Sequence, residues 1–180
     1  MDARRDEIAE AFKKRFLHFG YKKTSVDDVA RDLQISKKTI YAHFNTKEEV
    51  WYYVVYQVAL QFRNRMQADL ASQPGYAAKI SALIEQIFAQ TRQWLKEGND
   101  AFEFKYKYQI ARLAFKDAYA GLVKELIEQG MVAGEFAPAP PDLMLRFIEG
   151  VISESMDVVS ADPEREVSQN VIEAVLKLLK

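Results

Sequence analysis

The sequence predicts an all-α protein of about nine helices, arranged as a three-helix N-terminal head followed by a longer helical body. Three observations lead to this fold class. Glycine and proline are scarce, with 7 and 5 residues in a chain of 180, and they fall between segments of helical periodicity. Apolar residues recur three or four positions apart over long stretches. Residues that can cap helices precede several of these stretches, and no hairpin signal interrupts them.

The head is expected in residues 1–46. Its first helix covers Ala3–Phe19, where apolar residues follow helical spacing, and it ends at Gly20. Three hydroxyl side chains, spaced by ten or eleven positions, can cap the helices that follow: Ser25, Ser36 and Thr46. Short helices are unstable alone in water. We therefore expect the short helices to pack on one another and on the first helix.

The body is expected in residues 47–180 and begins with one long helix that extends from the Thr46 cap to about Leu70. Acidic Asp162 followed by Pro163 is a typical helix start, because proline is well tolerated at the first helical position. The remaining helices are expected over Tyr76–Lys96, Ala101–Phe115, Ala118–Gln129, Asp142–Ser160 and Pro163–Leu179.

The composition argues against several classes of protein. The chain has no cysteine, which excludes disulfides, thiolate metal ligands and cysteine nucleophiles. His18 and His43 lie far apart in the sequence, and no catalytic motif or phosphate-binding glycine loop is present. We therefore expect no enzymatic activity, no metal and no cofactor. The longest apolar run, Trp51–Tyr56, is far shorter than the ~20 residues that span a bilayer, and no signal peptide is seen. These features predict a cytoplasmic protein without membrane contact.

The second and third short helices have the pattern of a helix-turn-helix. Val29 and Ala30 give the second helix an apolar side, and Ile40 and Phe44 do the same for the third. The outer side of the third helix keeps cations, hydrogen-bond donors and an aromatic hydroxyl: Lys37, Lys38, Thr39, Tyr41 and His43. A short helix with this surface fits the major groove of double-stranded DNA. The net charge of −1 does not oppose this interpretation, because the placement of the cations matters more than their sum.

These residues, in this order, resemble the tetracycline-repressor (TetR) family of bacterial transcriptional regulators. The resemblance rests on Gly20-Tyr21, Thr24-Ser25-Val26, Val29-Ala30, Ser36-Lys37-Lys38-Thr39-Ile40-Tyr41-Ala42-His43-Phe44 and Lys47-Glu48. It covers about the first quarter of the chain, whereas the remainder resembles the family in length and helical layout only. It implies a ligand-responsive repressor that binds a palindromic operator as a homodimer. A small apolar or aromatic effector entering the body would release the DNA.

The resemblance also implies which side chains of the head contact DNA: Thr24, Ser25, Ser36, Lys37, Lys38, Thr39, Tyr41, His43 and Lys47. Thr39 and Tyr41 would reach phosphates or base edges, and Lys47 would hold a phosphate at the start of the fourth helix. Two positions depart from the family's commonest pattern, because Gln34 and Lys38 stand where glycine is frequent. Gln34 is expected to adopt a positive φ with some strain. Lys38 adds charge and reach, so no base preference can be transferred from a relative.

The body is expected to hold the effector and to form the dimer. Aromatic residues at helical spacing are usually plain core, but their density here also suits an apolar cavity with a few hydroxyl groups. The candidate ligand-binding residues are Phe62, Met66, Phe88, Trp94, Phe102, Tyr106 and Tyr108. The last two helices have apolar faces that can form a four-helix bundle with a second chain. The candidate interface residues are Phe147, Val151, Ile152, Met156, Val171, Val175 and Leu178.

Several alternatives stay open at this point. The last two helices can instead pack on the body of their own chain. The protein can be an activator rather than a repressor, or a DNA-binding regulator without a small-molecule ligand. An interaction protein whose head no longer binds DNA is disfavoured by the intact Thr39, Tyr41 and Lys47.

Overall fold

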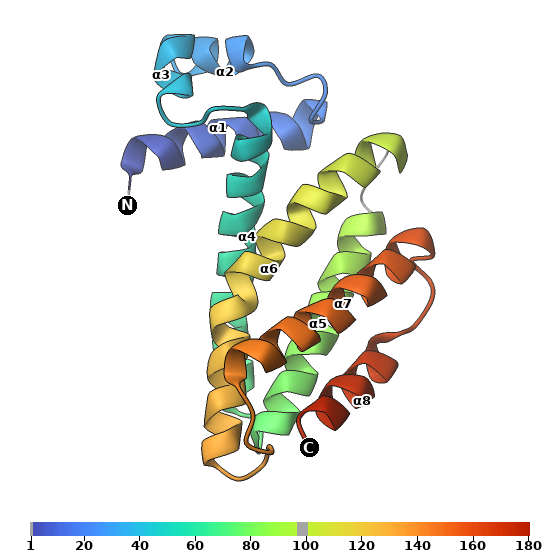
Figure 1. Ribbon diagram of the computed structural model, residues 1–180. Coiled ribbons are helices and arrows are strands. Elements are labelled where there is room, and N and C mark those ends of the chain that lie inside the picture. Colours follow the sequence, from blue (N-terminus) through green and yellow to red (C-terminus); the bar gives the residue numbers. More distant parts are fainter. Residues whose placement is uncertain (1, 97–100) are drawn as a thin grey trace. The chain divides into compact units, whose positions relative to one another are not determined.

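The computed structural model describes residues 2–96 and 101–180, with side chains described except for Trp94, Lys96 and residues 101–108. The described part contains eight helices and no strand, which confirms the all-α prediction (Figure 1). The helices are α1 (Ala3–Phe19), α2 (Val26–Asp32), α3 (Lys37–Tyr41), α4 (Lys47–Ala71), α5 (Tyr76–Lys96), α6 (Ala101–Val132), α7 (Pro141–Ala161) and α8 (Ser168–Leu178).

The three predicted caps form as local physical chemistry requires. The Ser25 hydroxyl accepts the backbone N–H of Asp28 at 3.1 Å, and the Ser36 hydroxyl accepts that of Thr39 at 3.1 Å. The Thr46 hydroxyl accepts the N–H of Glu49 at 3.1 Å. Each bond satisfies a donor that the first turn of a helix leaves unpaired.

The separate helices expected over Ala101–Phe115 and Ala118–Gln129 are wrong, because α6 is continuous from Ala101 to Val132. The intervening Lys116 and Asp117 include neither glycine nor proline, so nothing in the backbone ends the helix there. The continuous helix satisfies its own backbone groups at this point, and no cap is needed.

The start expected for the last helix at Pro163 is also wrong. Asp162 ends α7, and its own side chain and carbonyl accept the N–H groups of Glu164 and Arg165 in a turn. The chain then reaches Glu166, whose carboxylate accepts the backbone N–H of Ser168 at 3.1 Å. The helix α8 therefore begins at Ser168, five residues later than the proline signal indicates.

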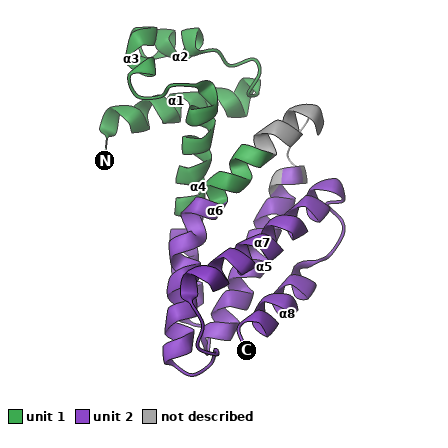
Figure 2. Ribbon diagram, viewed as in Figure 1, with its two compact units in different colours: residues 1–60, 101–115 green, residues 61–100, 116–180 purple. Residues whose placement is uncertain are grey.

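The chain divides into two compact units, coloured separately in Figure 2. Unit 1 contains residues 1–60 and 101–115, and unit 2 contains residues 61–100 and 116–180. The helix α4 therefore contributes to both units. The expected functional division at residue 46 stays a prediction.

Unit 1 has a compact core beneath its helix-turn-helix. Phe12 of α1, Val29 of α2 and Ile40 of α3 are buried, together with Phe44 in the segment before α4 and Val50 of α4. Contacts from α1 to α2 and from α2 to α3 hold the short helices in place. Burying a side chain of this size contributes about 1.5–3 kcal/mol, which explains how helices of seven and five residues persist.

Unit 2 is built around α5, α7 and α8, which pack against one another (Figure 1). After α6 the chain returns through Glu135, whose carboxylate accepts the backbone N–H groups of Tyr76 and Ala77 at 3.0 and 3.1 Å. These two bonds cap the start of α5 and hold the pKa of Glu135 below its ordinary value. The N–H of Ala137 then donates to the carbonyl of Leu179 at 2.8 Å, which fixes the loop against the end of α8.

No helix among residues 2–96 and 101–180 combines the length and the hydrophobicity that crossing a bilayer requires.

Candidate nucleic-acid interface

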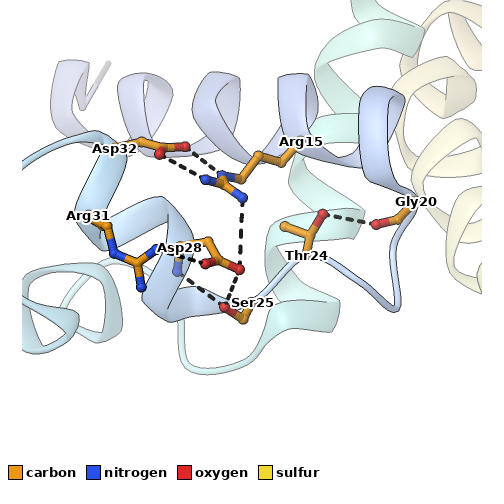
Figure 3. Close-up of polar contacts among 7 residues, drawn as sticks. All are labelled: Arg15, Gly20, Thr24, Ser25, Asp28, Arg31 and Asp32. Carbon is orange, nitrogen blue, oxygen red and sulfur yellow. Dashed lines mark hydrogen bonds and ion pairs between the residues drawn. The ribbon is translucent and has the colours of Figure 1, made fainter.

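The helix α2 is held to α1 by Arg15 (Figure 3). Nε and Nη2 of Arg15 in α1 donate to the two carboxylate oxygens of Asp32 at 2.5 and 2.8 Å, and Nη1 lies 3.8 Å from Asp28. The bonds from Arg15 hold the pKa of Asp32 below its ordinary value, and those of Ser25 do the same for Asp28. Two of the three acids of α2 are thus engaged away from α3.

The turn between α2 and α3 fixes the position of the third helix. Gln34 has a φ of 53°, which confirms the positive φ expected from the sequence. The next residue, Ile35, donates its N–H to the carbonyl of Ala30 at 2.9 Å, which closes the end of α2. The Ser36 cap follows, and Ile40 is buried against the core. The helix α3 is therefore fixed at both its start and its inner side.

The outer side of α3 stays open to solvent. Lys37, Lys38 and Tyr41 are exposed, with half of the Tyr41 surface accessible. Thr39 is partly covered, and its hydroxyl lies 2.9 Å from that of Ser36. A large aromatic residue left exposed beside two lysines gives this surface cationic, polar and apolar groups at once, which is the combination that base edges and phosphates require.

Lys37 has a partner on the neighbouring helix. Its ammonium lies 2.5 Å from the carboxylate of Asp27 in α2, and both side chains are 55% exposed. Sequence analysis did not single out Asp27, because a pairing between two helices depends on how they cross. Charge proximity in the sequence is too weak a signal to find it.

Two further basic candidates lie against other parts of unit 1. Nδ1 of His43 lies 2.9 Å from the carboxylate of Asp2, the residue that also caps α1. The Lys47 ammonium lies over the Tyr21 ring, 4.0 Å from its centroid. The Tyr21 hydroxyl in turn donates to Glu48 at 3.0 Å. Both side chains are thus positioned by contacts with residues distant in the sequence, His43 beside α3 and Lys47 at the start of α4.

Thr24 and Ser25 lie in the approach to α2 and differ in surroundings. Thr24 is 1% exposed, and its hydroxyl donates to the carbonyl of Gly20 at 2.9 Å (Figure 3). This side chain holds the turn after α1 and has no free surface for a phosphate. Ser25 is partly exposed, and its hydroxyl is occupied as the cap of α2.

The start of α4 is joined to α1 by charged and aromatic contacts. The Arg5 guanidinium lies 4.7 Å from the ring centroids of both Phe44 and Tyr53, and it pairs with Glu49 at 2.9 Å. The Tyr53 hydroxyl donates to Asp6 at 2.6 Å. Glu49 also accepts the backbone N–H of Asn45, one residue before the position that a regular capping box uses. These contacts make the first turns of α4 part of unit 1.

The candidate ligand-binding residues are described only in part. Met66 and Phe88 are buried in unit 2, and Phe62 is half-buried. The buried Tyr119 hydroxyl donates to the sulfur of Met66 at 3.6 Å, and burial raises the pKa of Tyr119 to about 12. The other four candidates lie outside the residues whose side chains are described: Trp94, Phe102, Tyr106 and Tyr108.

The candidate dimer residues separate into three groups by burial. Met156, Val171 and Val175 are buried within unit 2 of their own chain, as the alternative packing predicts. Phe147 and Leu178 are exposed by 46% and 41%. Val151 and Ile152 lie between these extremes. Exposed apolar side chains are thus found at Phe147 of α7 and Leu178 of α8, and Leu143, four residues before Phe147 on α7, is 43% exposed.

Comparison with known proteins finds a family match over about the first quarter of the chain. Residues 8–51 match the family model for bacterial regulatory proteins of the tetR family. The chain is 26% identical over 151 residues to the uncharacterized HTH-type transcriptional regulator YhgD of Bacillus subtilis (strain 168), covering 78% of this chain and 75% of that protein.

Solved structures share the fold. The transcriptional regulator FadR of Bacillus subtilis, determined in complex with stearoyl-CoA, has a TM-score of 0.61 at 20% identity, over 96% of this chain and 98% of that one. The protein RolR, determined with the ligand resorcinol, has a TM-score of 0.76 at 12% identity, over 98% and 87% of the two chains. At these identities the two structures establish the all-helical architecture along nearly the whole chain.

Proposed function

We propose that this protein, which carries the DNA-binding domain of the TetR family of bacterial regulators, represses transcription by binding a palindromic operator as a homodimer. A small apolar or aromatic effector bound in the body releases it from the DNA. The observation that carries the proposal is the outer side of α3, where Lys37, Lys38 and Tyr41 are exposed together while Ile40 on its inner side is buried.

The chemistry of α3 supports DNA as the partner. In the free protein the apolar ring of the exposed Tyr41 faces water, which is unfavourable. Against DNA the ring can pack on a thymine methyl group, and the hydroxyl can bond to the DNA backbone. Lys38 can donate to phosphates or to the acceptor atoms of guanine in the major groove. Thr39 supplies a hydroxyl, and Ser36 fixes the helix start from which these side chains project. Direct contacts to base edges give sequence preference, and phosphate contacts give affinity.

The remaining head candidates would act on the DNA backbone. His43 lies in the segment that joins α3 to α4, and Lys47 opens α4; each is already oriented by a partner, Asp2 and Tyr21. A preoriented side chain loses less entropy when it meets a phosphate. Ser25, which is partly exposed, would meet a phosphate at the start of α2, and the buried Thr24 would support it by holding the turn after α1.

A dimer gives this head useful specificity. One motif reads only a few base pairs, whereas two related by two-fold symmetry read half-sites about 34–36 Å apart or a multiple of that. Phe147 and Leu178 offer exposed apolar surface on α7 and α8 for the contact. Val151 and Ile152 border it. Met156, Val171 and Val175 would support it from inside the body.

Release by an effector is the second half of the proposal. Solved structures that share the fold include one determined with stearoyl-CoA and one with resorcinol. In this chain the seven candidate ligand-binding residues, from Phe62 to Tyr108, would hold the effector. Because α4 contributes to both units, a ligand that prefers one position of α4 would shift the population of head spacings. The fall in DNA affinity would be set by how much more tightly the ligand binds the released state than the DNA-bound state.

The test is selection of binding sites from a random duplex library with the purified full chain. We expect enrichment of a two-fold symmetric site, which is lost when Thr39→Ala and Tyr41→Ala are combined. Retention of binding by that double variant would contradict the assignment of α3. A folded dimer that enriches nothing would contradict the proposed function.

Salt dependence measures the role of Lys38 separately. Each phosphate contact contributes about −0.9 to the slope of log K against log salt concentration. We expect Lys38→Ala to make the slope less steep by about one if it binds a phosphate, and to relax base preference if it reaches a base edge. Lys177→Ala, which removes an exposed lysine from α8, is the matched control and should leave both properties unchanged.

A further inference from the structure

We infer that Asp27 restrains the affinity of the head for DNA of arbitrary sequence by neutralising Lys37. This inference rests on the proposed function. It assigns an affinity-limiting role to an acid of α2 that sequence analysis passed over, and it predicts that removing the acid strengthens binding.

The first step of the argument is the direction in which the acids of α2 face. Asp28 and Asp32 are occupied by Arg15 of α1 and, for Asp28, by the Ser25 hydroxyl. Asp27 lies instead against α3, with its carboxylate 2.5 Å from the Lys37 ammonium. Asp27 therefore places a negative charge directly beside the helix that we propose enters the DNA groove.

The second step concerns what this ion pair does. Both side chains are 55% exposed, and exposed ion pairs contribute little to folding stability. The two helices are already fixed by the buried Val29 and Ile40 and by the caps at Ser25 and Ser36. The pair is thus not needed to hold α2 on α3. Its main physical consequence is that Lys37 meets a phosphate only in competition with Asp27.

The third step links this competition to nonspecific binding. Binding to arbitrary sequences depends almost wholly on phosphate contacts, so a neutralised lysine weakens it directly. Binding to an operator also uses base contacts, which Asp27 leaves free: Lys38 and Tyr41 are exposed on the same helix. The Lys37 contact is therefore a larger share of the free energy of nonspecific binding, and a random-sequence duplex is the substrate on which its restraint is measured.

The experiment measures the affinity of the full-length protein for a random-sequence duplex across a series of salt concentrations. We expect Asp27→Asn to raise the affinity by about two- to fivefold, the range that an exposed ion pair corresponds to, and to steepen the salt slope by about one phosphate contact. Asp27→Glu retains the charge and should behave like the wild-type chain. Glu173→Gln, which makes the same change of charge at an exposed site on α8, controls for net charge.

A second background tests whether Asp27 acts through Lys37. In a Lys37→Met chain, Asp27→Asn should no longer change the salt slope, because the cation that it releases is absent. An equal effect in both backgrounds would overturn the inference in favour of direct repulsion between Asp27 and DNA. An unchanged affinity in Asp27→Asn, with folding verified by circular dichroism, would also overturn it. If the wild-type chain binds no duplex at low salt, the proposed function itself fails, and the inference with it.

Discussion

Gly130 lies two residues before the end of α6, and replacing it with alanine should strain the core of unit 2. A Cβ atom built at this position would lie 2.2 Å from both Cδ2 and Cε2 of the Phe136 ring. Atoms at ordinary contact are separated by more than 3.4 Å, so either the ring or the helix must move. Phe136 is buried, with 5% of its surface exposed.

The ring has little freedom to relocate. The N–H groups of Glu135 and Phe136 both donate to the carbonyl of Gly130, at 2.9 and 3.2 Å. These bonds hold the backbone of Phe136 beside Gly130, so the ring stays close to any methyl group added there. The bond from Ala137 to Leu179 holds the other side. Overpacking costs about 1–3 kcal/mol, and expelling a phenylalanine from a core costs about 3–5 kcal/mol. We expect Gly130→Ala to lower the free energy of unfolding by about 2–4 kcal/mol.

Equilibrium unfolding in urea, followed by circular dichroism, measures this loss. Gly121 provides a matched control within the same helix, because a Cβ there meets nothing within 4 Å. Gly121→Ala should stabilise the protein by about 0.5–1 kcal/mol through the higher helix propensity of alanine. The same substitution in one helix is thus expected to have opposite signs at two positions.

A double-mutant cycle with Phe136→Ala tests the cause. Once the ring is absent, Gly130→Ala should cost much less, because the three atoms nearest the added methyl group all belong to the Phe136 ring. The reasoning is refuted if Gly130→Ala is as mild as Gly121→Ala, or if its cost is the same with and without the Phe136 ring.

Two further predictions concern the turn of the head and the acid sensitivity of the body. Gln34→Gly should raise the free energy of unfolding by about 0.5–1 kcal/mol, because glycine adopts a φ of 53° without the strain that a side chain brings; urea unfolding should show no such gain for Gln34→Ala, and equal gains would contradict the strain. The bonds from Arg92 and Ser168 lower the pKa of Glu166 from 4.5 to about 2, so its charge stabilises the folded state above about pH 5 and this contribution is lost as the pH falls towards 2. The stability difference between wild type and Glu166→Gln should therefore shrink on acidification, and a difference independent of pH would contradict the assigned cause.

The sequence alone was sufficient where structure depends on neighbours along the chain. A cap joins a side chain to a backbone N–H three positions later, so Ser25, Ser36 and Thr46 could be assigned from their order. The positive φ of Gln34 followed from the turn in which it stands. The family resemblance likewise depended on a contiguous run of residues, 8–51 in the matching model.

Tertiary structure decided what depends on how helices cross. Three acids of α2 look alike in the sequence, yet Asp28 and Asp32 face Arg15 whereas Asp27 faces Lys37. Periodicity places a residue on the apolar side of a helix but does not say what packs against that side. Only the packing therefore shows that Met156 is buried and Phe147 is exposed. Which side chain a residue contacts across the fold depends on how the helices that carry the two residues pack. Residues that are neighbours in the sequence do not determine that packing.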